Sequence, residues 1–192
     1  MQGNEDLRVV KTIEGIKSAF ESLIVEKNFE QITVKELCER ARINKKTFYH
    51  YYETLQALLA EVQAELSKGF IERISDYSLP EDLDKVNREF FLFASEQGLA
   101  YEKITCGGSY RYIRDVMTDR VNEEGWSRSK QYQKLSGFEK KLLMDFINES
   151  VLNAYRQWVE SGKEIPLEEM IALTNRIVLG GVQGFFRGGE CF

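Results

Sequence analysis

The chain has 192 residues, of which 43% are hydrophobic, 30% are charged and only 2 are proline, a composition typical of a globular and largely helical protein. The formal net charge is -5, but residues 1–52 carry a net charge of +1 and the rest of the chain carries -6. The overall acidity therefore does not exclude a nucleic-acid partner for the N-terminal part.

Several classes of protein are disfavoured at once. Cys38, Cys106 and Cys191 lie far apart, so no zinc or redox motif is present and free thiols in a reducing cytosol are expected. The polar, acidic N-terminus does not resemble a signal peptide. The most apolar stretch, residues 171–186, is interrupted by polar residues and is shorter than the roughly 20 residues needed to span a bilayer. We expect a soluble, cytoplasmic protein without a membrane partner, metal or cofactor.

Three helices are predicted in the N-terminal part. From residue 7 to about residue 28, apolar residues recur at steps of three and four, which indicates an amphipathic helix. Thr33 and Glu36 have the spacing of a capping box that opens a short helix over residues 34–41. Arg42 and Ile43 then form a tight turn, and Asn44 caps a third helix over residues 45–52.

The remainder of the chain is also predicted to be helical. A long helix runs from about residue 54 to residue 77, and Pro80 marks the break before a helix that includes residues 86–93. Glycines divide the middle of the chain into short helices. Ser136 and Glu139 form a second capping box at the start of a long helix that stops at Gly162, and the last helix covers residues 166–186. No strand pattern competes, so we predict an all-α fold of about nine helices, with domains at 1–53 and 54–192.

The third predicted helix carries the clearest functional signal. Phe48 and Tyr52, four residues apart, can face inward with Ile43. The residues left on the outside are Lys45, Lys46, Thr47, Tyr49 and His50. Lysines neutralise phosphates, and hydroxyl and imidazole groups can bond phosphate oxygens or base edges.

Residues 35–52 hold five basic and two acidic residues, so this segment is a basic stripe on an acidic protein. Two short helices joined by a tight turn predict a helix-turn-helix domain that binds DNA.

The segment from about residue 10 to residue 59 resembles the TetR/AcrR-type family of transcriptional regulators. The resemblance rests on Ile32, Thr33, Val34, Leu37, Ala41, Ile43, Lys45, residues 47–52 and Leu55. It implies that Thr33 caps the second helix and touches a phosphate, and that Tyr49 and Tyr51 contact phosphates. It also implies that Lys45, Lys46, Thr47 and His50 face the bases. Family members usually carry lysines where this chain has Glu53 and Leu55, a departure that predicts weaker non-specific binding.

The C-terminal part is more weakly similar to Gram-positive-type members of the family. The resemblance implies a ligand-binding and dimerisation bundle, with a homodimer formed through the helices at 136–161 and 166–186. Such a dimer would place two recognition helices on a palindromic DNA operator. It would act as a repressor, and a small-molecule effector would release it from the DNA. Gly180, Gly181 and Gly184 indicate either close helix packing or a frayed helix end.

An effector pocket is expected inside the C-terminal bundle. The aromatic residues that could line it are Phe90, Phe93, Tyr101, Tyr110, Tyr112, Trp126, Phe146 and Tyr155. Aromatic residues of this kind belong to an ordinary hydrophobic core more often than to a pocket.

Two functions other than that of a repressor are alternatives for this sequence. An enzyme is disfavoured because His50 is the only histidine and because no phosphate-binding glycine loop or nucleophile elbow is present. The second alternative is a family member that acts mainly through protein contacts, as a co-activator with weak DNA binding. Glu53 and Leu55 favour this alternative, whereas the stripe from Lys45 to Tyr52 favours direct DNA binding.

Overall fold

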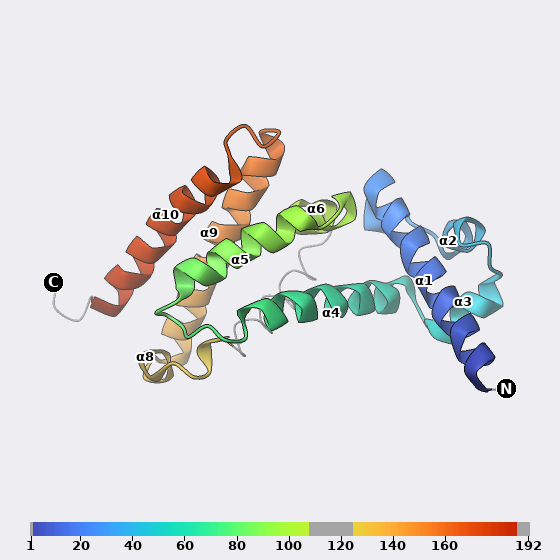
Figure 1. The fold of residues 1–192 in the computed structure, drawn as a ribbon, viewed down its shortest axis with the longest axis horizontal. Coiled ribbons are helices and arrows are strands. Elements are labelled where there is room, and N and C mark those ends of the chain that lie inside the picture. The colour runs from blue at the N-terminus through green and yellow to red at the C-terminus, as the bar shows by residue number, and fades with distance from the viewer. Residues whose placement is uncertain (1, 108–124, 188–192) are drawn as a thin grey trace.

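The computed structural model describes residues 2–107 and 125–187. These residues form nine α-helices and one 3₁₀ turn, without a strand, which confirms the predicted all-α class. The molecule is elongated, with a small head at the N-terminal end and a larger helical body at the C-terminal end (Figure 1). Helix α4 runs from the head into the body, so it connects the two parts.

The head consists of α1 (Gln2–Glu26), the 3₁₀ turn η1 (Phe29–Gln31), α2 (Val34–Arg40) and α3 (Lys45–Tyr51). Helix α1 begins five residues before the predicted start, because the sequence of residues 2–6 is polar and carries no apolar pattern. The core of the head also takes residues from α4 and α6. Its fully buried members include Ile16, Phe20, Leu23, Ile24, Leu37, Phe48, Leu58, Leu59 and Ile104.

Helix α4 (Leu55–Ile74) begins after Thr54, whose hydroxyl accepts a hydrogen bond from the Ala57 backbone at 3.0 Å. It ends three residues before the predicted position, and a connection through Pro80 leads to α5 (Leu83–Glu96). The two helices pack closely where Gly69 of α4 faces the ring of Phe93, since a Cβ at Gly69 would lie 3.4 Å from a ring carbon.

Helix α6 (Leu99–Cys106) touches both parts of the molecule. Ile104 is buried in the core of the head, and Lys103 Nζ lies 3.4 Å from the backbone oxygen of Val25 at the end of α1. The neighbouring Glu102 forms an ion pair with Lys163, in the turn after α9. Three successive residues of α6 therefore connect the head with the C-terminal hairpin.

The body is completed by α8 (Lys130–Gln133), α9 (Gly137–Glu160) and α10 (Leu167–Arg187). The capping box at the start of α9 is confirmed, because Ser136 Oγ accepts from the Glu139 backbone at 3.3 Å and Glu139 accepts from the Ser136 backbone at 2.7 Å. Gly162 ends the helix with a φ of +73°, a conformation that favours glycine. Helices α9 and α10 then pack against each other as an antiparallel pair (Figure 1).

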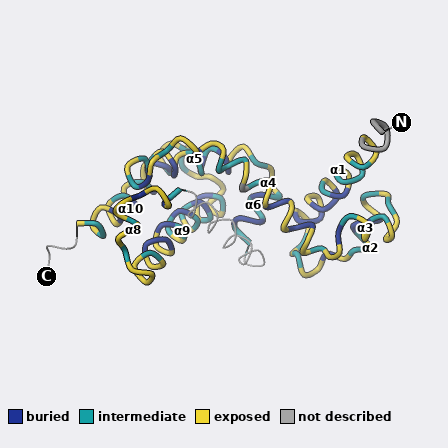
Figure 2. The backbone as a smooth tube through the Cα atoms, turned by 90° about the horizontal axis from the view of Figure 1, so that it is seen from below, coloured by how far each residue is buried: buried dark blue, intermediate teal, exposed yellow. Residues whose placement is uncertain are grey.

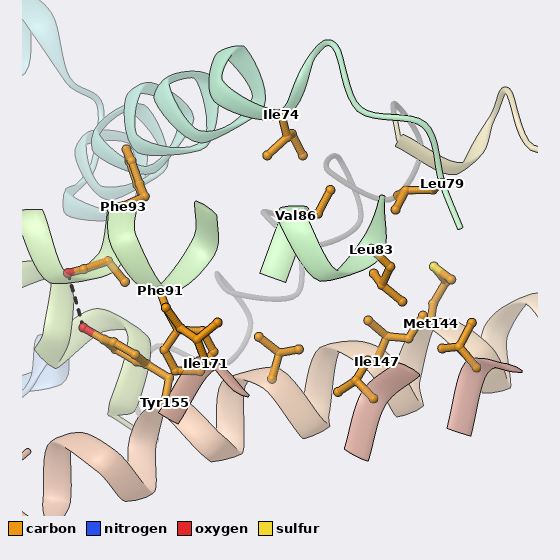
Figure 3. Close-up of a cluster of buried hydrophobic side chains, with 14 of the residues drawn as sticks. Ile74, Leu79, Leu83, Val86, Phe91, Phe93, Met144, Ile147, Tyr155 and Ile171 are labelled. Carbon is orange, nitrogen blue, oxygen red and sulfur yellow. Dashed lines mark hydrogen bonds between the residues drawn. The ribbon is translucent and has the colours of Figure 1, made fainter. Parts of the chain in front are cut away.

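The core of the body combines aliphatic side chains with aromatic ones, among them Phe91, Phe93 and Tyr155 (Figure 3). Tyr155 is fully buried and donates its hydroxyl to the backbone oxygen of Ala94 at 3.3 Å. Asn87 of α5 donates its amide to the side-chain oxygen of Asn175 on α10 at 3.1 Å, and the Asn175 amide donates to the backbone oxygen of Asp84 at 3.2 Å. These partly buried hydrogen bonds favour one alignment of the two helices, because a slip would break both of them. Among the described helices, none is long and apolar enough to cross a membrane.

One face of the α9–α10 pair is apolar and exposed to solvent. On α9, Phe138 is 77% exposed and Leu142 is 52% exposed; on α10, Ile177 is 65% exposed. Gly180 and Gly184 continue this face on α10, and a Cβ at either position would meet open space. Gly181 is different, because a Cβ there would lie 2.4 Å from the ring of Phe146. Close packing within the chain is therefore found at Gly181 and not at the other two glycines.

Candidate nucleic-acid interface

The start of α2 differs in one detail from the predicted capping box. Thr33 Oγ1 accepts a hydrogen bond from the Glu36 backbone at 3.2 Å, as expected. The Glu36 carboxylate does not return to the Thr33 backbone but binds the Nζ of Lys27, the residue directly after α1, at 2.6 Å. The reciprocal half of the box was therefore wrong, because a nearby ammonium group is a stronger partner for a carboxylate than a neutral backbone amide. The result is a bond that ties α2 to α1.

The turn between the two short helices is closed by the backbone. Ile43 N donates to Cys38 O at 2.9 Å, and Arg42 takes a left-handed conformation with a φ of 55°. Asn44 then caps α3 as predicted: its side-chain oxygen accepts from the Thr47 backbone at 2.8 Å and from the Thr47 hydroxyl at 3.1 Å. These bonds fix the direction in which α3 leaves the turn.

The inner side of α3 is anchored by aromatic residues. Phe48 is fully buried and Tyr52 is almost so, which confirms that these two residues face inward. Their ring centroids lie 5.9 Å apart, and Tyr49 meets the edge of Phe48 at 5.3 Å. Because this side is fixed in the core, the opposite side of α3 is presented to solvent in a defined orientation (Figure 2).

Six of the seven predicted DNA-binding residues belong to α3, and Thr33 caps the start of α2. Thr33, Lys45, Lys46, Tyr49 and His50 are exposed, whereas Thr47 and Tyr51 are partly buried. Tyr49 is 55% exposed although one edge of its ring contacts Phe48, an unusual degree of exposure for a large aromatic residue. His50 and Tyr51 are in edge-to-face contact at 4.8 Å. Within the described parts of the chain, no acidic side chain pairs with Lys45 or Lys46. The geometry is compatible with DNA contacts, which remain a prediction.

One of the five basic residues at positions 35–52, Arg40, is held in an ion pair inside the head. Arg40 is held by Glu26 of α1 through two bonds of 2.6 and 2.8 Å, and also donates to Ser22 at 2.8 Å. The hydrogen bond from Arg40 lowers the pKa of Glu26, so the pair stays ionised at neutral pH. Arg40 therefore braces α2 on α1, and the free positive charge beside α3 comes from Arg42, Lys45 and Lys46. Glu53 is exposed at the end of this surface.

The predicted pocket residues do not all come together. Phe90 and Tyr155 lie 5.6 Å apart, and Phe93 and Tyr101 lie 5.8 Å apart. Phe70 of α4 contacts both Phe90 and Phe93, so these residues form one packed group. Trp126 is buried against Tyr132 at 5.4 Å. Phe146 is directed elsewhere and lies over Gly181 of α10, because it is on a different face of α9 from Tyr155. Tyr110 and Tyr112 lie outside the described residues.

A groove that no sequence motif predicts lies at the end of the body far from the head. It has a volume of about 760 Å³ and is formed by the connection before α5, the end of α8 and the last turns of α10. Its walls include Pro80, Asp84, Lys134, Leu179 and Phe186. These residues come from three distant segments with no shared motif, so only the fold brings them together.

The cysteines and the acidic residues show no further site in the described part of the chain. Cys38 is buried and Cys106 partly buried, both without a disulfide, and Cys191 lies outside that part. Burial raises the pKa of the Cys38 thiol, which makes it less reactive. Residues 2–107 and 125–187 contain no group of three or more His, Cys, Asp or Glu side chains placed to hold a metal ion.

Known proteins resemble this chain in two ways. Residues 16–62 match the family described as bacterial regulatory proteins, tetR family. Over 96 residues the chain is 29% identical to the uncharacterized HTH-type transcriptional regulator YxbF of Bacillus subtilis (strain 168). That match covers 50% of this chain but only 23% of the relative. It therefore supports the kind of domain rather than the activity of the whole relative.

Solved structures extend the likeness to nearly the whole chain. A TetR transcriptional regulator from Streptococcus agalactiae 2603V superposes with a TM-score of 0.73 at 16% identity, over 93% of this chain and 99% of that one. The regulator FadR from Bacillus subtilis, in complex with stearoyl-CoA, superposes with a TM-score of 0.60 at 19% identity, over 91% and 98%. At this identity the superpositions show a shared fold. Residues 16–62 therefore match the tetR family of bacterial regulatory proteins, and the chain as a whole shares the fold of solved TetR-type regulators.

Proposed function

We propose that the protein is a repressor that binds a palindromic DNA operator as a homodimer through residues 33–52 and is released by a small molecule. The observation that carries the proposal is the geometry of α3. Its inner side is locked by Phe48 and Tyr52, and its outer side presents Lys45, Lys46 and Tyr49 to solvent. A rigid helix with a basic and hydroxyl-bearing outer face is what entry into a major groove requires. Function on DNA would place the protein in the bacterial cytoplasm.

Direct binding to duplex DNA is the first test. The purified protein is titrated with the DNA that flanks its own gene at two salt concentrations, beside the variants Tyr49→Ala and Lys46→Ala. Both substitutions should weaken binding, and loss of the positive charge in Lys46→Ala should lower the slope of log affinity against log salt by about 1. Circular dichroism and sedimentation confirm that the variants remain folded and keep the oligomeric state of the wild type. Undiminished affinity in both variants would contradict the assignment of the binding face.

The exposed apolar face of α9 and α10 supports the homodimer. Phe138, Leu142 and Ile177 are large apolar residues in solvent on two neighbouring helices, and Gly180 and Gly184 leave room for a second helix to approach. Exposed apolar patches of this kind commonly mark protein interfaces. A second copy packed on this face would form a four-helix interface and present two α3 helices to successive major grooves.

A small-molecule effector is supported more weakly. The packed aromatic group of Phe90, Phe93, Tyr101 and Tyr155 lies between the head and the C-terminal hairpin, next to the helices that connect them. One structural relative is known in complex with stearoyl-CoA, so a body of this architecture can hold a ligand. We propose that an effector enters the body beside this aromatic group and separates its rings. Thermal stabilisation of the protein by members of a metabolite library is the first screen.

Glu53 favours the alternative function through protein contacts. It is exposed directly after α3, where its carboxylate would repel a neighbouring phosphate. A co-activator would show weak duplex binding with little dependence on salt. In that case Glu53→Lys should create measurable, salt-sensitive binding, whereas in a true operator binder it should only strengthen binding that already exists.

A further inference from the structure

Helix α1 and the end of α3 both contact the carboxylate of Glu61 on α4. Lys17 of α1 places its Nζ 2.6 Å from Oε1 of Glu61 and 2.6 Å from Oε1 of Glu65. Tyr52, which follows α3, donates its hydroxyl to Glu61 at 3.1 Å. Only 16% of the Lys17 side chain is exposed, so these interactions are partly shielded from water and salt.

The protonation states at neutral pH maintain this network. Burial lowers the pKa of Lys17, but the hydrogen bonds to Glu61 and Glu65 outweigh it, and the pKa is raised overall. Burial and the negative charge of Glu61 raise the pKa of Tyr52 to about 12, so its hydroxyl keeps the proton that it donates. The ammonium group and the phenol therefore hold the carboxylates over the whole physiological range.

The position of this network separates it from the other ion pairs of the head. The pairs Lys27–Glu36 and Arg40–Glu26 join α1 to α2, within the helix-turn-helix domain itself. Lys17 instead joins α1 to α4, and Tyr52 joins the end of α3 to the same point of α4. Leu58, Leu59 and Val62 of α4 lie buried in the core of the head beside it. Polar and apolar contacts thus hold the start of α4 on the head.

We propose that Lys17, Glu61, Glu65 and Tyr52 form a clamp that makes the first three turns of α4 part of the DNA-binding head and positions α3 on its duplex. The clamp residues act through α3 and need no contact with DNA. The inference rests on the proposed function. It also implies that any change of angle between head and body is taken up beyond Glu65, in the part of α4 where Gly69 lies against Phe93.

The test compares two duplexes, one selected from a random-sequence library with the wild-type protein and one unrelated duplex of the same length. Lys17→Met should lower affinity for the selected duplex by roughly tenfold. Affinity for the unrelated duplex and the salt slope should stay unchanged, because no phosphate contact is lost. Lys17→Arg should restore most of the specific affinity. Arg73→Gln, which breaks an ion pair between the far end of α4 and Glu96, should behave like the wild type.

Hydrogen exchange tests the clamp without DNA. In Lys17→Met, amides of α3 and of residues 55–65 should exchange faster, whereas amides of α10 should not. If Lys17→Met folds poorly, Glu61→Gln replaces it, because the amide keeps the size of the side chain and an acceptor for Tyr52. Unchanged exchange together with unchanged specificity in a folded variant would overturn the clamp. A selection that enriches no sequence with the wild type would instead contradict the proposed function, and the exchange measurement would still decide the clamp.

Discussion

Arg42 illustrates how much of the binding domain depends on single residues. It sits in the turn between α2 and α3 with a φ of 55°, a conformation that costs a residue with a Cβ about 1–2 kcal/mol. Glycine would avoid this cost but would lose more entropy on folding. The exposed Arg42 side chain also adds positive charge next to Lys45 and Lys46.

Substitution at position 42 should separate these two contributions. Arg42→Gly is expected to leave the free energy of unfolding unchanged within about 1 kcal/mol, because relief of strain and loss of entropy nearly cancel. Arg42→Val should be less stable than Arg42→Gly by at least about 1 kcal/mol, because a β-branched residue fits a positive φ poorly. Urea unfolding monitored by circular dichroism measures both. Equal stability of the two variants would contradict the strained turn.

The helix caps show which residue-level features were predictable. Asn44 and Ser136 cap their helices through partners three residues away, so the sequence alone was sufficient to find them. Glu36 also lies at the required spacing, yet its carboxylate binds Lys27, a residue that only the packing of α2 on α1 brings close. Local spacing predicted the caps, whereas the choice between competing partners depended on the fold.

At the level of elements, the α9–α10 pair contains three glycines in different surroundings. Gly181 lies under the ring of Phe146, whereas Gly180 and Gly184 face open space. The sequence could not separate them, because glycines at helical spacing indicate close packing equally well at each position. For the same reason Phe146 was grouped with the pocket aromatics, since its type did not reveal which face of α9 meets α10.

The three glycines provide a matched set of alanine substitutions. Gly181→Ala should destabilise the protein by about 1–3 kcal/mol, because the new Cβ collides with Phe146. Gly180→Ala should stabilise the isolated subunit by roughly 0.5–1 kcal/mol through better helix propensity. If a second copy covers this face, Gly180→Ala should at the same time weaken association. Thermal unfolding and sedimentation at several protein concentrations measure both effects. An unchanged stability of Gly181→Ala would contradict tight packing between Gly181 and the ring of Phe146.

For the whole molecule, the critical property is the oligomeric state. The class of fold and the DNA-binding domain could be predicted from helical periodicity and the residues of α3. The apolar face of α9 and α10 could not be read from the sequence in the same way, because an exposed apolar stripe and a buried one have the same spacing. Only the fold shows that Leu142 and Ile177 remain exposed.

A charge placed on this face should separate the subunits. Ile177→Glu is expected to convert a dimer into a monomer at micromolar concentration, because burying a carboxylate without a partner costs several kcal/mol. Affinity for duplex DNA should fall with it, since a monomer presents one recognition helix instead of two. Leu99→Glu is the matched control, because Leu99 is 66% exposed on α6, away from this face. A monomeric wild type, or an Ile177→Glu dimer, would contradict the interface.

The contribution of α6 to the core of the head limits how heads and bodies can be exchanged by recombination. Ile104 lies more than forty residues beyond the matched family segment, yet it fills the core of the head beside Phe20 and Leu58. A recombination event that joined residues 1–53 to another regulator's body would leave that core open on one side. Such a hybrid would survive only if the new body supplied a side chain of similar size at the same place. Heads and bodies of this architecture are therefore expected to be exchanged as matched pairs rather than as interchangeable parts.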